Sequence, residues 1–263
     1  MRIALTIAGS DSGGGAGIQA DLKTFQRFGV FGTSAITAIT AQNTRGVSRW
    51  EAMSADLVRA QIDAVAEDLP PAAFKSGMLG NAAVATAVSD AIRGLSLPNY
   101  VLDPVMVATS GDMLLEQEAI TVIREELLPQ ATLVTPNIHE AAILVGELIE
   151  DEDGMARAAE TIVTQLGARA ALVKGGHLSG DRVVDILYDG DIRAFRGLRI
   201  ESSSTHGTGC TLSAAITAQL AKGESLHAAV RSSIEYVHAA IETAPGLGGG
   251  HGPLNHSAGK ADP

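Results

Sequence analysis

The sequence has a single cysteine, Cys210, among 263 residues. One thiol excludes an internal disulfide framework and any metal site built from several thiolates. Basic residues are also few: 19 Lys and Arg stand against 30 Asp and Glu, the formal net charge is −11, and no run of Lys or Arg exceeds two. The chain lacks the basic surface that binding to a phosphate backbone requires, so we expect no nucleic-acid partner.

Long apolar runs and several common catalytic motifs are missing too. No segment approaches the roughly 18 apolar residues of a membrane helix, and the start MRIALTIAGSD becomes polar before a signal-peptide core could form. We therefore expect a cytoplasmic protein without a membrane partner. No HExxH, CxxC or Gly-x-Ser-x-Gly element occurs, and the seven histidines show no metal-ligand spacing. Hydrolase and metalloenzyme interpretations have little support.

What the chain does contain is an alternation of short apolar runs with alanine-rich amphipathic stretches. The expected strands are Ile3–Ala8, Ser34–Ile39, Ala73–Ser76, Tyr100–Asp103, Thr132–Thr135, Ala170–Lys174, Val183–Tyr188 and Ile192–Phe195. The expected helices are Gly17–Phe28, Leu57–Asp68, Val84–Arg93, Ile120–Leu128, His139–Leu148, Met155–Leu166, Thr208–Lys222 and Leu226–Thr243. One α/β domain over residues 1–245 and a loosely ordered Gly-rich tail, 246–263, are predicted.

This rhythm of strands and helices predicts how the sheet is built and where its ligands bind. Strands that alternate with helices of this length form a doubly wound, mostly parallel sheet with helices on both faces. The last two expected strands form a hairpin around Asp189-Gly190, which adds a small antiparallel edge. Ligands of such sheets bind beyond the carboxyl ends of the strands, so we look for functional residues there.

The segment from Thr205 to Thr211 precedes an apolar helical run and contains Gly207 and Gly209. Free N–H groups and the positive end of the helix dipole make such a turn an anion site, but a plain helix start capped by Thr208 has the same pattern. Cys210 would lie in the first helical turn, where the dipole lowers a thiol pKa and favours a role as proton acceptor. The alternative for Cys210 is a small buried filler.

Two further glycine-rich or polar strand ends carry candidate residues. The turn from Gly9 to Gly17 follows the first strand without the spacing of a P-loop or a dinucleotide fingerprint, and Asp21 after it is either a solvated helix charge or a substrate contact. Asn137 and Glu140 have the spacing of a capping box and could equally help to hold a hydrated Mg²⁺.

Asp103 and Lys174 also end expected strands. Asp103 is a second carboxylate of the kind that accompanies Mg²⁺. Lys174 precedes Gly175-Gly176 and could reach nucleotide phosphates or simply extend from the strand end into water.

Eight segments, taken in order, resemble the ribokinase-like superfamily and, within it, the hydroxymethylpyrimidine and phosphomethylpyrimidine kinases of thiamine biosynthesis. They are AGSDSGGGAGIQADLKTF (8–25), TAITAQNTRGV (37–47), KSGML (75–79), LDPVMVATSGD (102–112), TPNIHEA (135–141), VKGGH (173–177), STHGTGCTLSAA (204–215) and GGHGPLNH (249–256). The resemblance implies a three-layer ribokinase-like fold and a homodimeric kinase that uses ATP and Mg²⁺. It would phosphorylate 4-amino-5-hydroxymethyl-2-methylpyrimidine and then convert the monophosphate to the diphosphate.

The resemblance also assigns roles by motif position. The pyrimidine contacts would be Gln42, Asp21, Gly9, Met78 and Val105, and the Gln42 amide suits an aminopyrimidine because it offers both a donor and an acceptor. The nucleotide contacts would be Lys174, Asn137, Thr205, Thr208 and Gly209, the metal neighbours Asp103 and Glu140, and the catalytic group Cys210, Lys174, Gly207 and Gly209. Related sugar kinases carry an aspartate base where this chain has Cys210.

Three alternatives stay open at this point. The first is pyridoxal kinase activity on the same fold, because pyridoxal also carries a ring-bound hydroxymethyl group. The second is a non-catalytic pyrimidine-binding protein, against which Lys174, Glu140 and Cys210 argue. The third is a hydroxyethylthiazole kinase, which the segments 8–25 and 37–47 fit less well.

Overall fold

The computed structural model describes residues 1–106, 116–176, 178 and 180–259, so the end of the segment 102–112 and His177 lie outside the described residues. Within these ranges one nine-stranded sheet forms the centre of the molecule, with the order β3-β2-β1-β4-β5-β6-β7-β8-β9. Its strands are β1 (Ile3–Asp11), β2 (Phe31–Asn43), β3 (Gly46–Ala52), β4 (Ala73–Ser76), β5 (Tyr100–Leu102), β6 (Leu133–Val134), β7 (Ala171–Lys174), β8 (Arg182–Tyr188) and β9 (Ile192–Leu198).

The middle of this sheet is parallel and both edges are antiparallel. Strands β2, β1, β4, β5, β6 and β7 pair in parallel, whereas β3 pairs antiparallel with β2 and the β8–β9 hairpin continues antiparallel from β7. The prediction of a mostly parallel sheet with an antiparallel edge is confirmed. The parallel order places the carboxyl ends of β1, β4, β5, β6 and β7 along one rim, as the doubly wound fold requires.

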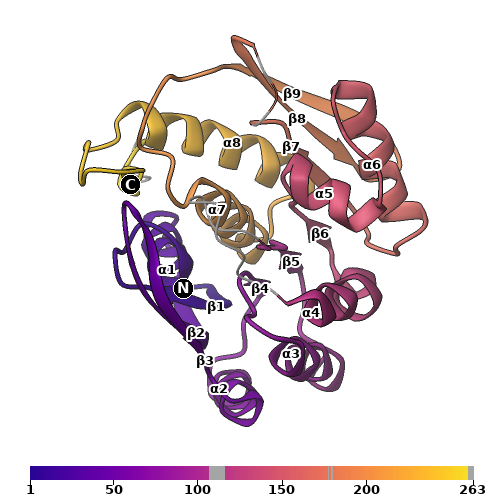
Figure 1. Ribbon diagram of the computed structural model, residues 1–263. Coiled ribbons are helices and arrows are strands. Elements are labelled where there is room, and N and C mark those ends of the chain that lie inside the picture. Colours follow the sequence, from indigo (N-terminus) through magenta and orange to yellow (C-terminus); the bar gives the residue numbers. More distant parts are fainter. Residues whose placement is uncertain (107–115, 177, 179, 260–263) are drawn as a thin grey trace.

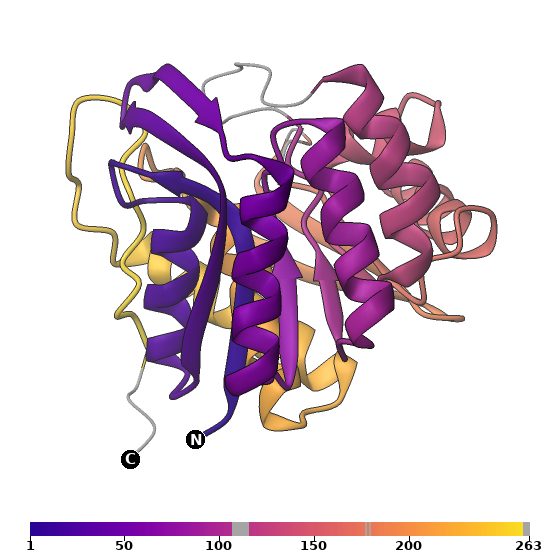
Figure 2. The same cartoon turned by 90° about the horizontal axis from the view of Figure 1, so that it is seen from below.

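Helices cover both faces of the sheet (Figure 1). One face carries α1 (Gly17–Arg27), α7 (Thr208–Lys222) and α8 (Leu226–Glu242). The other carries α2 (Ala55–Asp68), α3 (Ala82–Leu95), α4 (Gln117–Val122), α5 (Ile138–Val145) and α6 (Glu152–Thr164). In Figure 2, which faces this side of the sheet, α2 and α3 lie side by side in front of the strands, in agreement with their mutual contacts.

Each central strand contributes side chains to two hydrophobic cores, one on each face of the sheet, because successive side chains point to opposite faces. In β1, Leu5 and Ile7 pack on the side of α2 to α6, while Ala4 packs on the side of α1, α7 and α8. In β5, Leu102 and Val101 divide in the same way. Strands buried on both faces read as continuous apolar runs, which is why the sequence locates them so closely.

The structure departs from the sequence-based expectations at β3, α4 and the tail. β3 was missed because none of its residues is buried and its sequence does not alternate between apolar and polar residues. The helix expected from Ile120 to Leu128 is α4 followed by a π turn (Ile123–Leu127) and a 3₁₀ turn (Leu128–Gln130).

The expectation of a loosely ordered tail is wrong for residues 252–258. Leu254 and Ala258 are buried in the core beneath α8, and the backbone N–H of His206 donates to the Gly252 carbonyl at 3.1 Å. None of the helices in the described ranges combines the length and the apolar composition that a membrane span needs.

A core substitution tests this packing. Phe74 is fully buried and its ring stacks on Tyr100 with a centroid distance of 4.7 Å. Phe74→Ala is expected to lower the free energy of unfolding by about 3–5 kcal/mol, since the cavity that remains cannot fully collapse. Urea unfolding followed by circular dichroism measures the change. Phe31→Ala, at a position 48% exposed, is the matched control, and equal losses at the two positions would refute the assigned core.

Candidate active site

A cavity of about 760 Å³ opens at the rim formed by the carboxyl ends of the parallel strands. It is lined from both halves of the sheet and by the turn that starts α7. All but one of the residues expected from the sequence reach it: Gly9, Gln42, Met78, Asp103, Val105, Asn137, Glu140, Lys174, Thr205, Gly207, Thr208, Gly209 and Cys210. The exception is Asp21. Residues scattered over the sequence thus share one wall because the strands end at one edge.

The amino end of α7 faces this cavity. Gly207 is its N-cap residue, with a φ of +83° that favours glycine, and in the described part of the chain no side chain caps the helix. The expected cap by Thr208 is wrong, because its hydroxyl donates to the Thr205 carbonyl at 2.7 Å. The turn therefore keeps the character of an anion site, with the first N–H groups and the positive end of the dipole at the cavity.

Lys174 lies beside this turn and pairs with Asp103. Its Nζ is 3.2 Å from Asp103 Oδ1, and the Ser213 hydroxyl donates to Asp103 Oδ2 at 3.1 Å. A Cβ at Gly209 would lie only 3.0 Å from Lys174 Nζ, so glycine lets the amine approach the helix end. Burial opposes charge on both groups, but their mutual attraction prevails, which lowers the pKa of Asp103 and raises the pKa of Lys174.

Glu140 and Asn137 form a capping box at the start of α5, as the sequence predicts. Asn137 Oδ1 accepts from the Glu140 N–H at 2.9 Å, and Glu140 Oε2 accepts from the Asn137 N–H at 2.8 Å. Glu140 is only 5% exposed. Burial raises its pKa to about 7, although the charge of Lys174 opposes the rise. Capping thus holds a carboxyl group at the cavity whose negative charge Lys174 stabilises only in part.

The acidic residues fit one kind of metal binding and not another. Among the described residues no group of three or more His, Cys, Asp or Glu side chains could enclose a metal ion. Asp103 and Glu140 line the same cavity, and each influences the ionisation of the other groups around Lys174. Mg²⁺ usually takes one or two carboxylates and completes its shell with water and phosphate oxygens. The residues fit a hydrated Mg²⁺ shared with phosphates rather than a cage of protein ligands.

The other end of the cavity is apolar. Met78 and Val105 form a small cluster with Ala38 and Trp50, and a Cβ on Gly9 would come within 3.2 Å of the Met78 sulfur. The geometry of this end suits a flat ring, with backbone of β1 below it and the Met78 thioether beside it.

Asp21, the exception, is fully buried beneath the site. Its Oδ1 is 2.9 Å from Lys75 Nζ, and its Oδ2 accepts from the Thr6 hydroxyl at 2.6 Å. In this structure it does not line the cavity, and its contact with the substrate stays a prediction. Sequence reasoning also missed Lys75, whose signal was a lysine inside the short buried run of β4. Lys75 adds positive charge beneath Cys210 and Asp103.

The Cys210 thiol is neutral in this environment. Burial raises its pKa to about 12, and Lys75 only partly offsets the rise. This is opposite to the lowering expected from a place in the first helical turn, so that prediction is wrong. Loss of water around the sulfur outweighs the opposing effect of Lys75.

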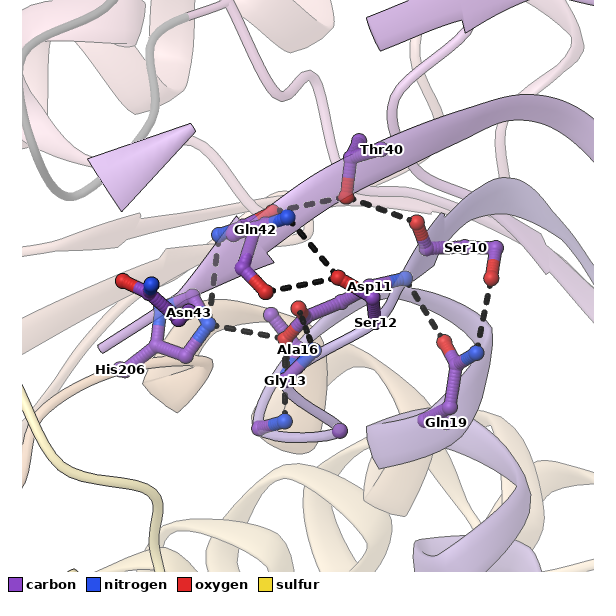
Figure 3. Close-up of polar contacts among 12 residues, drawn as sticks. Ser10, Asp11, Ser12, Gly13, Ala16, Gln19, Thr40, Gln42, Asn43 and His206 are labelled. Carbon is purple, nitrogen blue, oxygen red and sulfur yellow. Dashed lines mark hydrogen bonds and ion pairs between the residues drawn. The ribbon is translucent and has the colours of Figure 1, made fainter. Parts of the chain in front are cut away.

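The glycine-rich turn after β1 is organised by Asp11, a residue not among those expected from the sequence. Asp11 Oδ1 accepts from the Gly13 N–H at 2.7 Å, and Oδ2 accepts from the N–H groups of Gly15 and Ala16 at 3.0 and 2.8 Å. His206 Nε2 lies 2.9 Å from the same Oδ2 (Figure 3). An Asp at the start of a Gly-rich turn is a signal that its side chain caps the turn, so this role of Asp11 could have been predicted. Nothing in the sequence indicated its second partner, His206.

Alkylation tests the protonation of Cys210, the chain's only thiol. We expect its rate of reaction with iodoacetamide to rise about tenfold per pH unit from about pH 7 to pH 10 without a plateau, because only the thiolate reacts. Mass spectrometry measures the rate. The protein unfolded in guanidinium is the control and should level off above its ordinary pKa of about 8.5. A plateau below about pH 9 in the folded protein would contradict the raised pKa.

Comparisons with known proteins agree with this arrangement. The family model described as phosphomethylpyrimidine kinase matches residues 11–255. A hydroxymethylpyrimidine/phosphomethylpyrimidine kinase of Rhizobium meliloti is 56% identical over 97% of this chain and 96% of its own. The solved phosphomethylpyrimidine kinase of Clostridium difficile matches with a TM-score of 0.82 and 43% identity, covering 92% of this chain and all of its own.

A second solved structure widens the range of related activities. The ADP complex of Bacillus subtilis pyridoxal kinase matches with a TM-score of 0.92 and 40% identity, covering 98% of both chains. The region that the family model matches includes most of the first glycine-rich turn, the turn before α7 and the buried Leu254 of the tail. The fold of the solved relatives is the doubly wound sheet described above. The chain therefore belongs to the phosphomethylpyrimidine kinase family.

Proposed function

We propose that this protein transfers the γ-phosphoryl group of ATP to the hydroxymethyl group of 4-amino-5-hydroxymethyl-2-methylpyrimidine and then phosphorylates the monophosphate, as a step of thiamine biosynthesis. One observation carries the proposal: a single cavity joins an apolar ring site beside Gln42 to an uncapped helix end beside Lys174. The names of the relatives and the ADP bound to the Bacillus subtilis structure support the same chemistry.

Phosphoryl transfer needs positioning and charge stabilisation more than covalent chemistry, because its transition state is loose. Lys174 and the N–H groups at Gly209 and Cys210 would receive the charge that develops on the transferred group. Thr205, Thr208 and Asn137 would contact the nucleotide. Bound Mg²⁺ would neutralise phosphate charge, held near Asp103 and Glu140 through water. Lys174 in turn keeps Asp103 ionised in the free protein.

A coupled assay of ATP consumption tests the proposal. The aminopyrimidine and its monophosphate should each support turnover, and Lys174→Gln should lower kcat/KM by about 10²- to 10³-fold, since one preorganised cation at the phosphates is lost. Arg124→Gln, which removes an exposed charge in the π turn after α4 that does not line the cavity, is the matched control and should leave the rate unchanged. Tight pyrimidine binding without ATP consumption would instead identify a non-catalytic binding protein.

Pyridoxal kinase activity is the second candidate, supported by the likeness to the Bacillus subtilis pyridoxal kinase. The same assay with pyridoxal decides between them through the ratio of kcat/KM values. We expect the aminopyrimidine to be preferred because Gln42 reaches the cavity with an amide that can pair with an aminopyrimidine edge.

A homodimer is part of the same proposal. Within the described residues β3 ends the sheet, so its outer edge pairs with no strand of this chain. Ile39 on the neighbouring β2 is 44% exposed. An open strand edge beside exposed apolar surface is a suitable site for pairing with a second copy.

Cys210→Ala tests the part that the thiol plays. Only a thiolate can accept the hydroxyl proton, and the raised pKa leaves almost none at neutral pH. We therefore expect kcat to fall by less than the roughly 10²-fold lower bound for loss of a general base. Stopped-flow or steady-state turnover with the aminopyrimidine measures the change. A fall of about 10³-fold or more with an unchanged KM would restore Cys210 as the base.

A further inference from the structure

Asp11 fixes the protonation of His206. Its Oδ2 already accepts two backbone N–H groups and lies 2.9 Å from His206 Nε2. Burial would raise the pKa of Asp11, but His206 and these N–H groups lower it below its ordinary value, so the carboxylate is charged. A carboxylate offers only lone pairs, hence Nε2 must carry a hydrogen. His206 is an N–H donor on the side that faces the cavity.

Packing holds the imidazole of His206 in this position. The side chain is 6% exposed, and a Cβ on Gly15 would lie only 2.6 Å from its Cδ2 and 3.1 Å from Pro253. Its backbone N–H donates to Gly252 in the buried tail. The ring is therefore held between the first glycine-rich turn and the tail, and it cannot turn its Nε2 elsewhere.

Gln42 lies between this donor and Thr40, as Figure 3 shows. As the structure places the amide, its nitrogen Nε2 is 3.3 Å from His206 Nε2 and its oxygen Oε1 is 3.3 Å from the Thr40 hydroxyl. Thr40 has one hydrogen, which it donates to the Ser10 carbonyl at 2.9 Å, so it offers Gln42 a lone pair.

The two neighbours of the Gln42 amide thus make opposite demands. His206 Nε2 has no lone pair and only the hydrogen that it gives to Asp11, which a second acceptor can share, whereas Thr40 offers a lone pair. The amide meets both demands when its oxygen faces His206 and its nitrogen faces Thr40, which exchanges two ends of nearly identical shape. Without this exchange, an amide N–H faces the N–H of His206.

We infer that His206 is a positioning residue that fixes the orientation of the Gln42 amide and thereby selects the edge of the substrate ring. This inference rests on the proposed function. With both flanks engaged, the amide retains one N–H and one oxygen lone pair for the cavity, in a fixed order. A 4-aminopyrimidine presents the matching pair, N3 as acceptor and the amino group as donor, just as adenine does to a carboxamide. A 4-oxo ring reverses that order and is rejected.

The test compares the aminopyrimidine with 5-hydroxymethyl-2-methylpyrimidin-4-one. We expect the wild-type protein to favour the amino compound in kcat/KM by at least about tenfold, and His206→Phe to lower that ratio by about tenfold through KM, with little change in kcat. His206→Gln keeps an amide N–H near the place of Nε2 and should restore the ratio. Thr40→Val releases the other end of the Gln42 amide and should also weaken the discrimination.

Two controls separate this role from general damage. His251→Phe changes an exposed histidine that contacts Thr205 rather than Gln42, and it should leave the ratio at the wild-type value. The ¹⁵N chemical shifts of the imidazole in the free wild-type protein should show hydrogen on Nε2 of His206, a readout that needs no activity. If His206→Phe does not fold, Thr40→Val and the imidazole spectrum still decide.

Each outcome has a clear meaning. An unchanged ratio in folded His206→Phe and in Thr40→Val, failure of His206→Gln to restore it, or hydrogen on Nδ1 alone would each overturn the inference. Absence of turnover with any pyrimidine in the wild-type protein would refute the proposed function itself, whereas normal turnover with equal rates for the amino and oxo compounds would refute only the role of His206.

Discussion

The close approach of the turns that begin α1 and α7 is the constraint on which the rest of the site depends. A Cβ at Gly207 would lie 1.9 Å from the Gly15 carbonyl oxygen, and a Cβ at Gly17 would lie 2.3 Å from that of Gly9. Only glycine permits such contacts. Because the two turns touch, both helices begin at one cavity and His206 reaches Asp11 from a position 195 residues away in the chain.

Burial determines which groups around the cavity are charged as much as the attraction between opposite charges does. Lys75 with Asp21 and Lys174 with Asp103 are buried pairs, in which each charge is tolerable only because its partner is present. Glu140 and Cys210 lack a partner of equal strength, so burial raises the pKa of both. An acidic protein can thus maintain a site for phosphates, since what matters is the local set of lysines and helix N–H groups rather than the net charge.

The sequence predicts the layers better than it predicts the site. The bounds of β4 and α7 agree with the expectation, whereas β3 escaped because none of its residues is buried and its sequence shows no apolar alternation. The site residues predicted from the motifs nearly all line one cavity. The motifs could not show that Asp21 is buried under the cavity, because a charge on a helix looks the same whether it meets water or Lys75.

Side-chain orientation lies further beyond the sequence, since it depends on contacts between distant segments. Gln42 and His206 are separated by 164 residues. The orientation of the Gln42 amide depends on which nitrogen of His206 carries the hydrogen, and Asp11 fixes that position. A fixed amide orientation matters for a kinase that phosphorylates first the alcohol and then its monophosphate. The alcohol and its monophosphate differ at the acceptor oxygen but share the ring edge. Recognition fixed at that edge is the part of the site that can serve both steps unchanged.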